Sequence, residues 1–287
     1  MKKVFLLVFL FTALGVYSQG IHMQNGKYRD YNDYRSFIEF SGTNVIEKWR
    51  SARDGKYNKI SPLSGTYSLS VENRVNFLNV TWKNNTKEKF LVLTIRERSG
   101  FFLYNSDGKP YFIGMLCDDG EYLGDFGMEA DFSMDRYTFN ISGITSSSSL
   151  REGNISHTPD RINLNANEAW AEGAKGSGVG EYIIFNEKID VIHETLFISF
   201  GYVSYSKPNL FSDNARPKKI KVSWADTNQS VIMDLYDTPN FQVIEKPKRN
   251  FDSEGFSGPI KIEILEVYPG TKYSDTCIFA AFVHFSQ

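Results

Sequence analysis

The sequence has little cysteine and histidine, and this limits the chemistry that it can support. Its two cysteines, Cys117 and Cys277, stand in different halves of the chain and make no disulfide framework. An exported chain could join them, but two buried thiols that pack as small apolar residues are the favoured interpretation. No histidine has a second histidine or a cysteine at ligand spacing, so the sequence does not predict a zinc site. The four histidines are His22, His157, His193 and His284.

Motifs of nucleophilic catalysis are also missing. The sequence contains neither a Gly-x-Ser-x-Gly elbow nor a cysteine nucleophile motif. Asp118 and Asp119 are adjacent acids on an expected turn, where paired carboxylates usually face solvent. We therefore expect a protein that is not an enzyme; a hydrolase is an alternative, because its two acids need no recognisable spacing. Residues 118–121 (DDGE) lack the spacing of a calcium loop, so no cofactor is expected, and calcium in a structural role is left open.

After its first residues the chain has no apolar run long enough to cross a bilayer, which requires about 20 residues. Lys2 and Lys3, the apolar run 4–14 and the small residues that follow form the three-part pattern of a secretory signal, with cleavage near Ser18. We expect residues 1–18 to be removed and the mature bacterial protein to be secreted, periplasmic or on the cell surface. The net charge then falls from −2 to −4, and a faintly acidic chain lacks the basic surface that nucleic acids require.

Aromatic residues are abundant, and their distribution predicts strands. There are 23 Phe, 16 Tyr and 4 Trp, and these residue types favour half-buried pleated surfaces. No stretch of 12 or more residues shows a persuasive 3.6-residue apolar period. We therefore expect an all-β fold, with residues 19–143 forming a small β-barrel or sheet domain. Its expected strands are 75–82, 89–96, 101–104 and 110–114, the first two joined as a hairpin.

A polar segment separates this half from a second set of expected strands. Residues 144–160 include four consecutive serines, Gly153 and Pro159, and this composition favours a linker. A long loop within one domain is the alternative, but such loops are uncommon in compact domains. Residues 161–287 then form a second domain, in which strict alternation at 260–264 places isoleucines in a core. The other expected strands are 182–185, 196–205, 220–224, 231–235 and 277–285.

Three separated motifs stand out in the second half. They are 170–181 (WAEGAKGSGVGE), 209–216 (NLFSDNAR) and 267–278 (VYPGTKYSDTCI). Over residues 160–287 their order and spacing resemble the discoidin-like domain at the translocation end of secreted NAD glycohydrolases, called the NADase-type glycan-binding domain. The chain departs from the family pattern at 279–281 (FAA), where the family tends toward a small residue and an acid. The resemblance implies a galactose-binding-like β-sandwich jelly roll that binds glycans, without the NAD cleavage performed by a separate domain.

The side chains in these motifs suit sugar recognition, so we expect an exported, non-catalytic carbohydrate-binding protein. Trp170 could stack on a sugar ring, and Glu172 could accept sugar hydroxyls or pair with Arg216. Amide, hydroxyl and guanidinium groups supply the several donors and acceptors that a sugar site uses. The alternatives are a core tryptophan and a solvated loop whose Arg216 forms a structural ion pair. The candidate ligand-binding residues are Trp170, Glu172, Tyr202, Asn209, Asn214 and Arg216.

The first domain is loosely similar to the small lipocalin-like barrels attached to exported bacterial proteins. The similarity lies in residues 63–67 (LSGTY), the expected hairpin and residues 101–104. Such a barrel could carry a small hydrophobic ligand, although small barrels are often filled by their own side chains. A carrier is therefore the alternative to glycan binding. The expected partner is a glycan or glycoconjugate, with no nucleic acid and no integral membrane segment.

Overall fold

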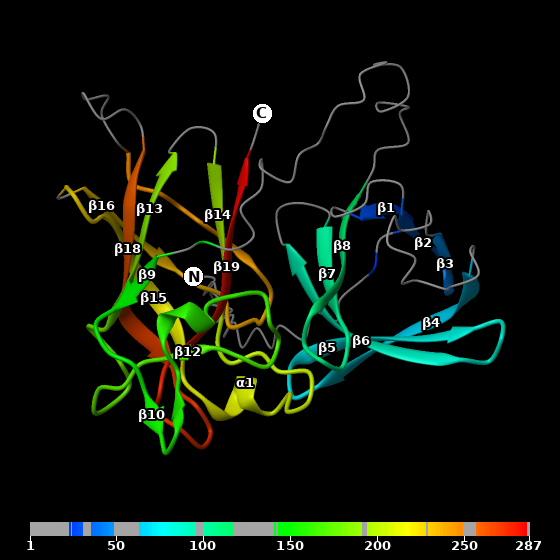
Figure 1. Cartoon of the computed structure of the whole chain (residues 1–287), viewed down its shortest axis with the longest axis horizontal. Helices are drawn as coiled ribbons and strands as arrows, with labels where there is room; N and C mark the ends of the chain where they lie inside the picture. Colours follow the sequence, from blue (N-terminus) through cyan, green and yellow to red (C-terminus); the bar gives the residue numbers. More distant parts are fainter. Residues whose placement is uncertain are drawn as a thin grey trace, which may run out of the picture.

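The protein consists of two β units that lie side by side (Figure 1). One is a closed barrel, and the other contains two larger sheets, so the expected all-β fold is confirmed. The expected leader, residues 1–18, lies outside the described part of the chain. The structure is a computed structural model that describes residues 23, 25–30, 36–48, 63–95, 100–116, 141, 143–190, 194–227, 229–248 and 257–285.

The barrel has eight antiparallel strands that follow one another in chain order and close where β1 pairs with β8. They are β1 (Gly26–Asp30), β2 (Phe37–Ser41), β3 (Asn44–Lys48), β4 (Leu63–Glu72), β5 (Val75–Trp82), β6 (Lys87–Ile95), β7 (Gly100–Tyr104) and β8 (Pro110–Leu116). The expected hairpin is β5 and β6, and the next two expected strands are β7 and β8. An eight-stranded up-and-down barrel is the arrangement that lipocalin-like proteins use.

Aromatic rings fill the described interior of the barrel. Tyr28 packs on Phe101 with ring centroids 4.7 Å apart, and Phe40 packs on Tyr67 at 4.9 Å. Further buried side chains of this interior are Met23, Ile38, Val45, Leu78, Val80, Trp82, Phe90, Val92, Leu103 and Phe112. These side chains occupy space that a hydrophobic ligand would need. The described part of the barrel therefore gives the carrier hypothesis no support.

The second unit is a sandwich of one five-stranded and one four-stranded antiparallel sheet. The five-stranded sheet contains, in spatial order, β16 (Ser230–Asp234), β15 (Arg216–Trp224), β18 (Ser257–Tyr268), β13 (Tyr182–Asp190) and β9 (Ile144–Ser146). The four-stranded sheet contains β12 (Trp170–Ala171), β19 (Cys277–Phe285), β14 (Glu194–Phe200) and β17 (Gln242–Ile244). The predicted alternation in β18 is confirmed, because its isoleucines at 260, 262 and 264 are buried in the core between the sheets.

The segment that was expected to be a linker belongs to the sandwich. Residues 144–146 form β9, which pairs with β13 at the edge of the five-stranded sheet. The two-residue strands β10 (Arg151–Glu152) and β11 (Ile155–Ser156) then form a small hairpin, and the turn η2 (Pro159–Arg161) follows. The linker prediction is wrong because the serine-rich stretch obtains its hydrogen bonds from neighbouring strands, which composition alone does not reveal.

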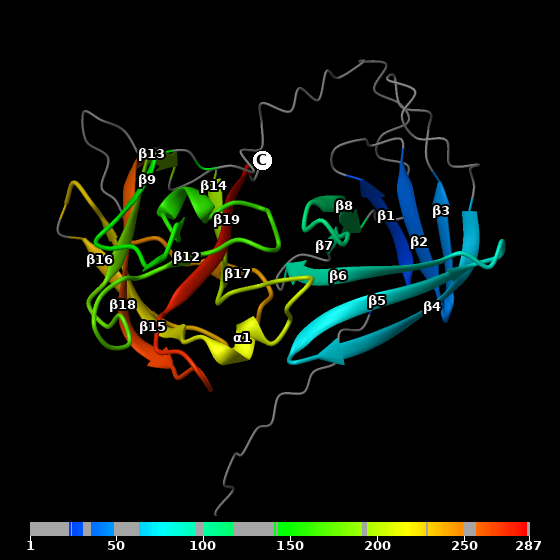
Figure 2. The same cartoon turned by 60° about the horizontal axis from the view of Figure 1, so that its bottom comes forward.

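Strands β5 to β8 are buried on both faces, because the outside of the barrel packs against the four-stranded sheet of the sandwich (Figure 2). In β6, Phe90 and Val92 belong to the barrel interior, whereas Leu91 and Leu93 belong to the interface. This explains why residues 90–93 (FLVL) form a continuous apolar run rather than an alternating one.

On the sandwich side, the interface is the outer face of β14, β19 and the residues before β17. Phe282 stacks on Phe197 with centroids 4.9 Å apart and an interplanar angle of 10°. It also lies 5.0 Å from Phe241 and 5.3 Å from Phe102 of the barrel. The two units therefore share one apolar cluster of aromatic rings.

The departure from the family pattern at residues 279–281 lies in this interface. The pairing of β14 with β19 shifts register there, and Phe279 and Ala280 both face the barrel. Phe279 packs on Tyr104 of the barrel at 6.1 Å, and the small Ala280 permits close approach. An acid at this place would be buried against apolar rings, which is unfavourable without a partner.

The two cysteines can be compared only in part. Cys277 is a buried free thiol at the start of β19, and burial raises the pKa of this thiol well above its usual value. Cys117, the other member of the expected pair, lies outside the described residues.

Candidate functional site

The three sequence motifs converge at one end of the sandwich. The start of β15 pairs with the end of β18 through Arg216 and Tyr268, and Ala215 forms a bridge to Thr276. The Thr276 hydroxyl donates to the carbonyl of Ser177 at 2.8 Å. We refer to residues 172–181, 207–216 and 268–276 together as the rim, which is at the bottom left of Figure 1.

Glu172 is a buried residue that holds two loops of the rim together by hydrogen bonds, and it is not exposed to accept hydrogen bonds from a sugar. Its side chain is fully buried and accepts hydrogen bonds from the backbone N–H groups of Ala174 at 2.7 Å and Thr276 at 3.3 Å. Burial raises the pKa of this carboxyl, and the two backbone hydrogen bonds oppose that rise. The glycine loop is shaped around it, because Gly178 has φ +72° and a Cβ there would lie 2.5 Å from the Cγ atom of Glu172.

Arg216 is also buried, and its partner is not the one expected. Its Nε donates to Asp237 Oδ1 at 2.7 Å, whereas the sequence suggested a pair with Glu172. Its Nη1 donates to the carbonyls of Phe211 at 3.0 Å and Asn214 at 2.7 Å. The alternative expectation, a structural ion pair, therefore describes Arg216 in this structure. Asn214 is buried beside it.

Trp170 lies in the core between the two sheets, with no exposed surface. Its Nε1 donates to the carbonyl of Ser148 at 3.0 Å. Ser147 and Ser148 both donate to the carboxylate of Glu181. The serine run therefore forms hydrogen bonds both with Trp170 and with the end of the glycine-rich loop 173–181. The ring of Trp170 consequently has no face on which a sugar could stack, and the core alternative applies.

The remaining two candidates, Tyr202 and Asn209, differ in exposure. Tyr202 is half-buried, donates its hydroxyl to the carbonyl of Asn167 at 3.0 Å, and packs edge-on against His157. Asn209 is exposed on the rim, where its amide donates to the carboxylate of Asp213 at 2.7 Å. Only Asn209 among the six candidates offers a freely accessible side chain at the rim.

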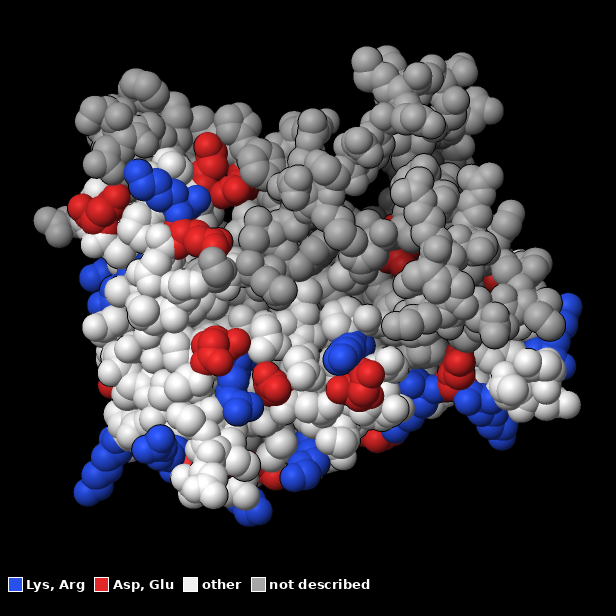
Figure 3. Space-filling view, viewed as in Figure 1, with Lys and Arg blue, Asp and Glu red and all other residues white. Residues whose placement is uncertain are grey.

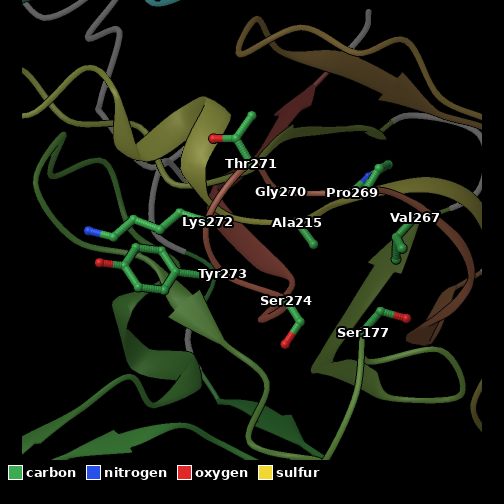
Figure 4. Close-up of a pocket in the computed structure, with 9 residues that line it drawn as sticks. All are labelled: Ser177, Ala215, Val267, Pro269, Gly270, Thr271, Lys272, Tyr273 and Ser274. Atoms are coloured by element: carbon green, nitrogen blue, oxygen red, sulfur yellow. The ribbon is translucent and has the colours of Figure 1, made fainter.

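An open pocket of about 300 Å³ lies between the loops of the rim (Figure 4). It is lined by Ser177, Ala215, Val267, Pro269, Gly270, Thr271, Lys272, Tyr273 and Ser274. Three of these residues carry hydroxyls on short side chains, while alanine, valine and proline give an apolar wall. None of the nine is acidic, so the pocket lacks the pair of carboxylates that glycoside hydrolysis requires.

Lys272 and Tyr273 extend side by side from the outer edge of the pocket (Figure 4). The Lys272 ammonium lies 4.8 Å from the centroid of the Tyr273 ring, and a hydrogen bond with Tyr273 raises the pKa of the ammonium group. Tyr273 is 38% exposed. Neither residue is among the candidates expected from the sequence, although an aromatic side chain next to a cation within the motif 267–278 was the available signal.

Neither the charges on the visible face nor the described His, Cys, Asp and Glu side chains indicate a second site. Acidic and basic side chains are interspersed on the face seen in Figure 3. The described residues contain no group of three or more His, Cys, Asp or Glu side chains that could hold a metal ion. The acidic stretch 118–121 lies outside them. No helix among the described residues is long and apolar enough to cross a membrane.

Residues 136–284 match the family described as the NAD glycohydrolase translocation F5/8 type C domain. No curated protein matches the chain. Two cryo-EM structures of a mutant arabinofuranosyltransferase AftD from Mycobacteria are similar to it at 13% and 14% identity, with TM-scores of 0.32 and 0.31. These matches cover 51% and 49% of the chain, which spans only 11% of the length of either transferase chain. Because the family match covers more than half of its length, the chain belongs to the NAD glycohydrolase translocation F5/8 type C domain family.

Proposed function

We propose that this is an exported, non-catalytic glycan-binding protein whose site is the rim pocket. The observation that carries the proposal is the convergence of the three motif-bearing loops around an open pocket whose lining combines hydroxyl-bearing and apolar side chains. Sugar rings present both hydroxyls and C–H faces, so a lining of this kind complements them. Family membership supports the same function, because the resemblance on these motifs implies glycan binding.

The residues proposed to contact the glycan differ from those first expected. Tyr273 offers an exposed ring at the pocket edge, and Lys272 beside it offers a cation and hydrogen-bond donors. Ser177 and Ser274 offer hydroxyls within the lining, whereas the Thr271 hydroxyl donates to the carboxylate of Asp213 at 3.0 Å. Trp170, Glu172 and Arg216 are buried beneath the rim, and their hydrogen bonds to backbone groups position the loops that carry these contacts.

A non-catalytic role is supported by the composition of the pocket and by the family description. No acid lines the pocket, and the matched family is named for translocation rather than for the glycohydrolase reaction. Export is proposed from the leader pattern in residues 1–18, and a secreted, periplasmic or cell-surface location follows from it.

A glycan array probed with residues 19–287 tests this function. We expect the parent chain to retain a subset of glycans and Tyr273→Ala to lose most of that signal, since stacking on an exposed ring contributes about 1 kcal/mol or more. Tyr236→Ala is the matched control, because Tyr236 is 57% exposed but does not line the pocket. A parent chain that retains no glycan on the array refutes the proposed function. Equal losses in the two tyrosine variants would place the site elsewhere.

A further inference from the structure

The turn between β4 and β5 has a backbone that ordinary side chains avoid. Asn73 has φ +48° and Arg74 has φ +73°. Two consecutive residues with positive φ in a two-residue hairpin loop are typical of Asn-Gly sequences, in which glycine takes the second place without strain. An arginine at that second place is unfavourable by backbone geometry, so its side chain must be held by contacts elsewhere.

Those contacts are made with the sandwich and not with the barrel. Nη1 of Arg74 donates to Asp237 Oδ2, and Nη2 donates to the main-chain carbonyl of Asp237, both at 2.6 Å. The guanidinium also lies 5.6 Å from the ring of Phe211 in α1 (Leu210–Asp213). Figures 1 and 2 show the β4–β5 turn beside α1.

Asp237 connects the barrel turn to Arg216 of the rim. Its other oxygen accepts the Nε hydrogen bond of Arg216, and the Arg216 guanidinium lies 5.1 Å from the same Phe211 ring. Burial raises the pKa of Asp237, but the hydrogen bonds and charges of Arg216 and Arg74 outweigh that effect and hold the pKa below its usual value. The two guanidinium groups thus share one carboxylate and one aromatic ring.

From α1 the connection continues into the pocket loop. The carbonyl of Ser212 accepts from the N–H of Thr271 at 3.0 Å, and its hydroxyl donates to the carbonyl of Asn73 at 3.2 Å. The carbonyl of Asp213 accepts from the N–H groups of Lys272 at 3.1 Å and Tyr273 at 2.8 Å. The segment 207–216 therefore has the barrel turn on one side and the pocket loop on the other.

We propose that Arg74 of the barrel is a positioning residue for the rim pocket, which it supports through Asp237, α1 and the backbone of residues 271–273. The proposal rests on the proposed glycan-binding function for its binding readout, but not for its structural one. It gives the barrel a role in the site although the barrel contributes none of the nine pocket-lining residues.

The substitution Arg74→Gly separates positioning from general stability. Glycine suits φ +73° and so favours the turn, while it deletes the guanidinium. We expect glycan retention on the array to weaken about tenfold in apparent Kd, a coupling of ordinary size between distinct sites. Arg74→Lys keeps the cation but loses the bidentate pair of hydrogen bonds to Asp237. Its apparent Kd should fall between those of the parent and Arg74→Gly. Lys83→Ala removes an exposed cation at the opposite end of β5 and should change nothing.

Hydrogen exchange supplies a readout that needs no glycan. In Arg74→Gly the amides of residues 271–273 and 211–216 should exchange faster, while those of β18 in the sandwich core stay protected. Unchanged exchange in both segments, or unchanged glycan affinity in a chain that does bind, overturns the positioning role. A parent chain without glycan binding refutes only the proposed function, since the exchange result stands by itself.

Discussion

Replacing Phe282 with alanine should uncouple the two β units. Phe282 is 2% exposed, and among the described rings it packs on Phe197, Phe241 and Phe102, the last of which belongs to the barrel. Deleting its ring opens a cavity in the shared apolar cluster, and the surrounding aromatic rings can collapse into it only in part. The barrel and the sandwich would then no longer unfold as one cooperative unit.

The size of the effect follows from the burial of the ring. A buried Phe→Ala substitution lowers the free energy of unfolding by about 3–5 kcal/mol, and aromatic pairs contribute roughly 0.5–1.5 kcal/mol each beyond their buried area. Three pairs place Phe282→Ala in the upper part of that range. At about 2–4 °C per kcal/mol for chains of roughly this size, the first unfolding transition should fall by on the order of 10 °C.

Calorimetry and hydrogen exchange measure this directly. The parent chain should show one transition and Phe282→Ala two, and the amides of β6 in the barrel should exchange faster although the substitution is in the sandwich. Phe185→Ala is the matched control, because Phe185 is fully buried in the sandwich's own core and does not touch the interface. It should lower stability by a similar amount without releasing β6. A loss under about 1 kcal/mol with one transition retained would refute a cooperative interface.

Two further predictions concern the sandwich alone. Hydrogen bonds from two lysines of β15 lower the pKa of Glu266 to about 2, so its stabilising contribution is complete above pH about 4.5 and is lost as the pH falls toward 2. Urea midpoints between pH 6 and 3 should therefore fall less in Glu266→Gln than in the parent, and equal slopes would contradict this. Gly178→Ala should lower the free energy of unfolding by about 2 kcal/mol through positive φ and a clash with Glu172. Gly180→Ala, where a Cβ meets nothing within 4 Å, should lose less in the same thermal scan, and equal losses would remove the clash from the explanation.

The strands were predictable where burial leaves a local pattern. Strict alternation in β18 and the aromatic hairpin of β5 and β6 each identify a strand without tertiary information. The serine-rich residues 144–148 carry no such pattern, and their pairing with β13 depends on a strand that begins about 35 residues later. The apolar runs in β6 and β19 are typical of strands that are buried on both faces, but a single sequence does not say that both runs lie in one interface between the two units.

The sequence predicted which loops form the rim, but it did not predict which of their side chains are exposed and which are buried. The three motifs located its loops, and the structure brings these loops together. The exposure of Trp170 and Arg216 depends on partners far along the chain, the carbonyl of Ser148 and the carboxylate of Asp237. A residue type that suits sugar also suits a buried hydrogen bond, so chemistry at these positions could not decide between the two roles.

The outer face of β14 and β19 gives a criterion for sorting relatives of this chain. A sandwich of this family that works without an attached barrel would expose residues 197, 279 and 282 to water, and polar side chains are expected there. Aromatic residues at the same positions would indicate relatives in which a second domain packs on this face. For the same reason, a shortened protein that begins at β9 would need these three positions resurfaced before it could remain dispersed in solution.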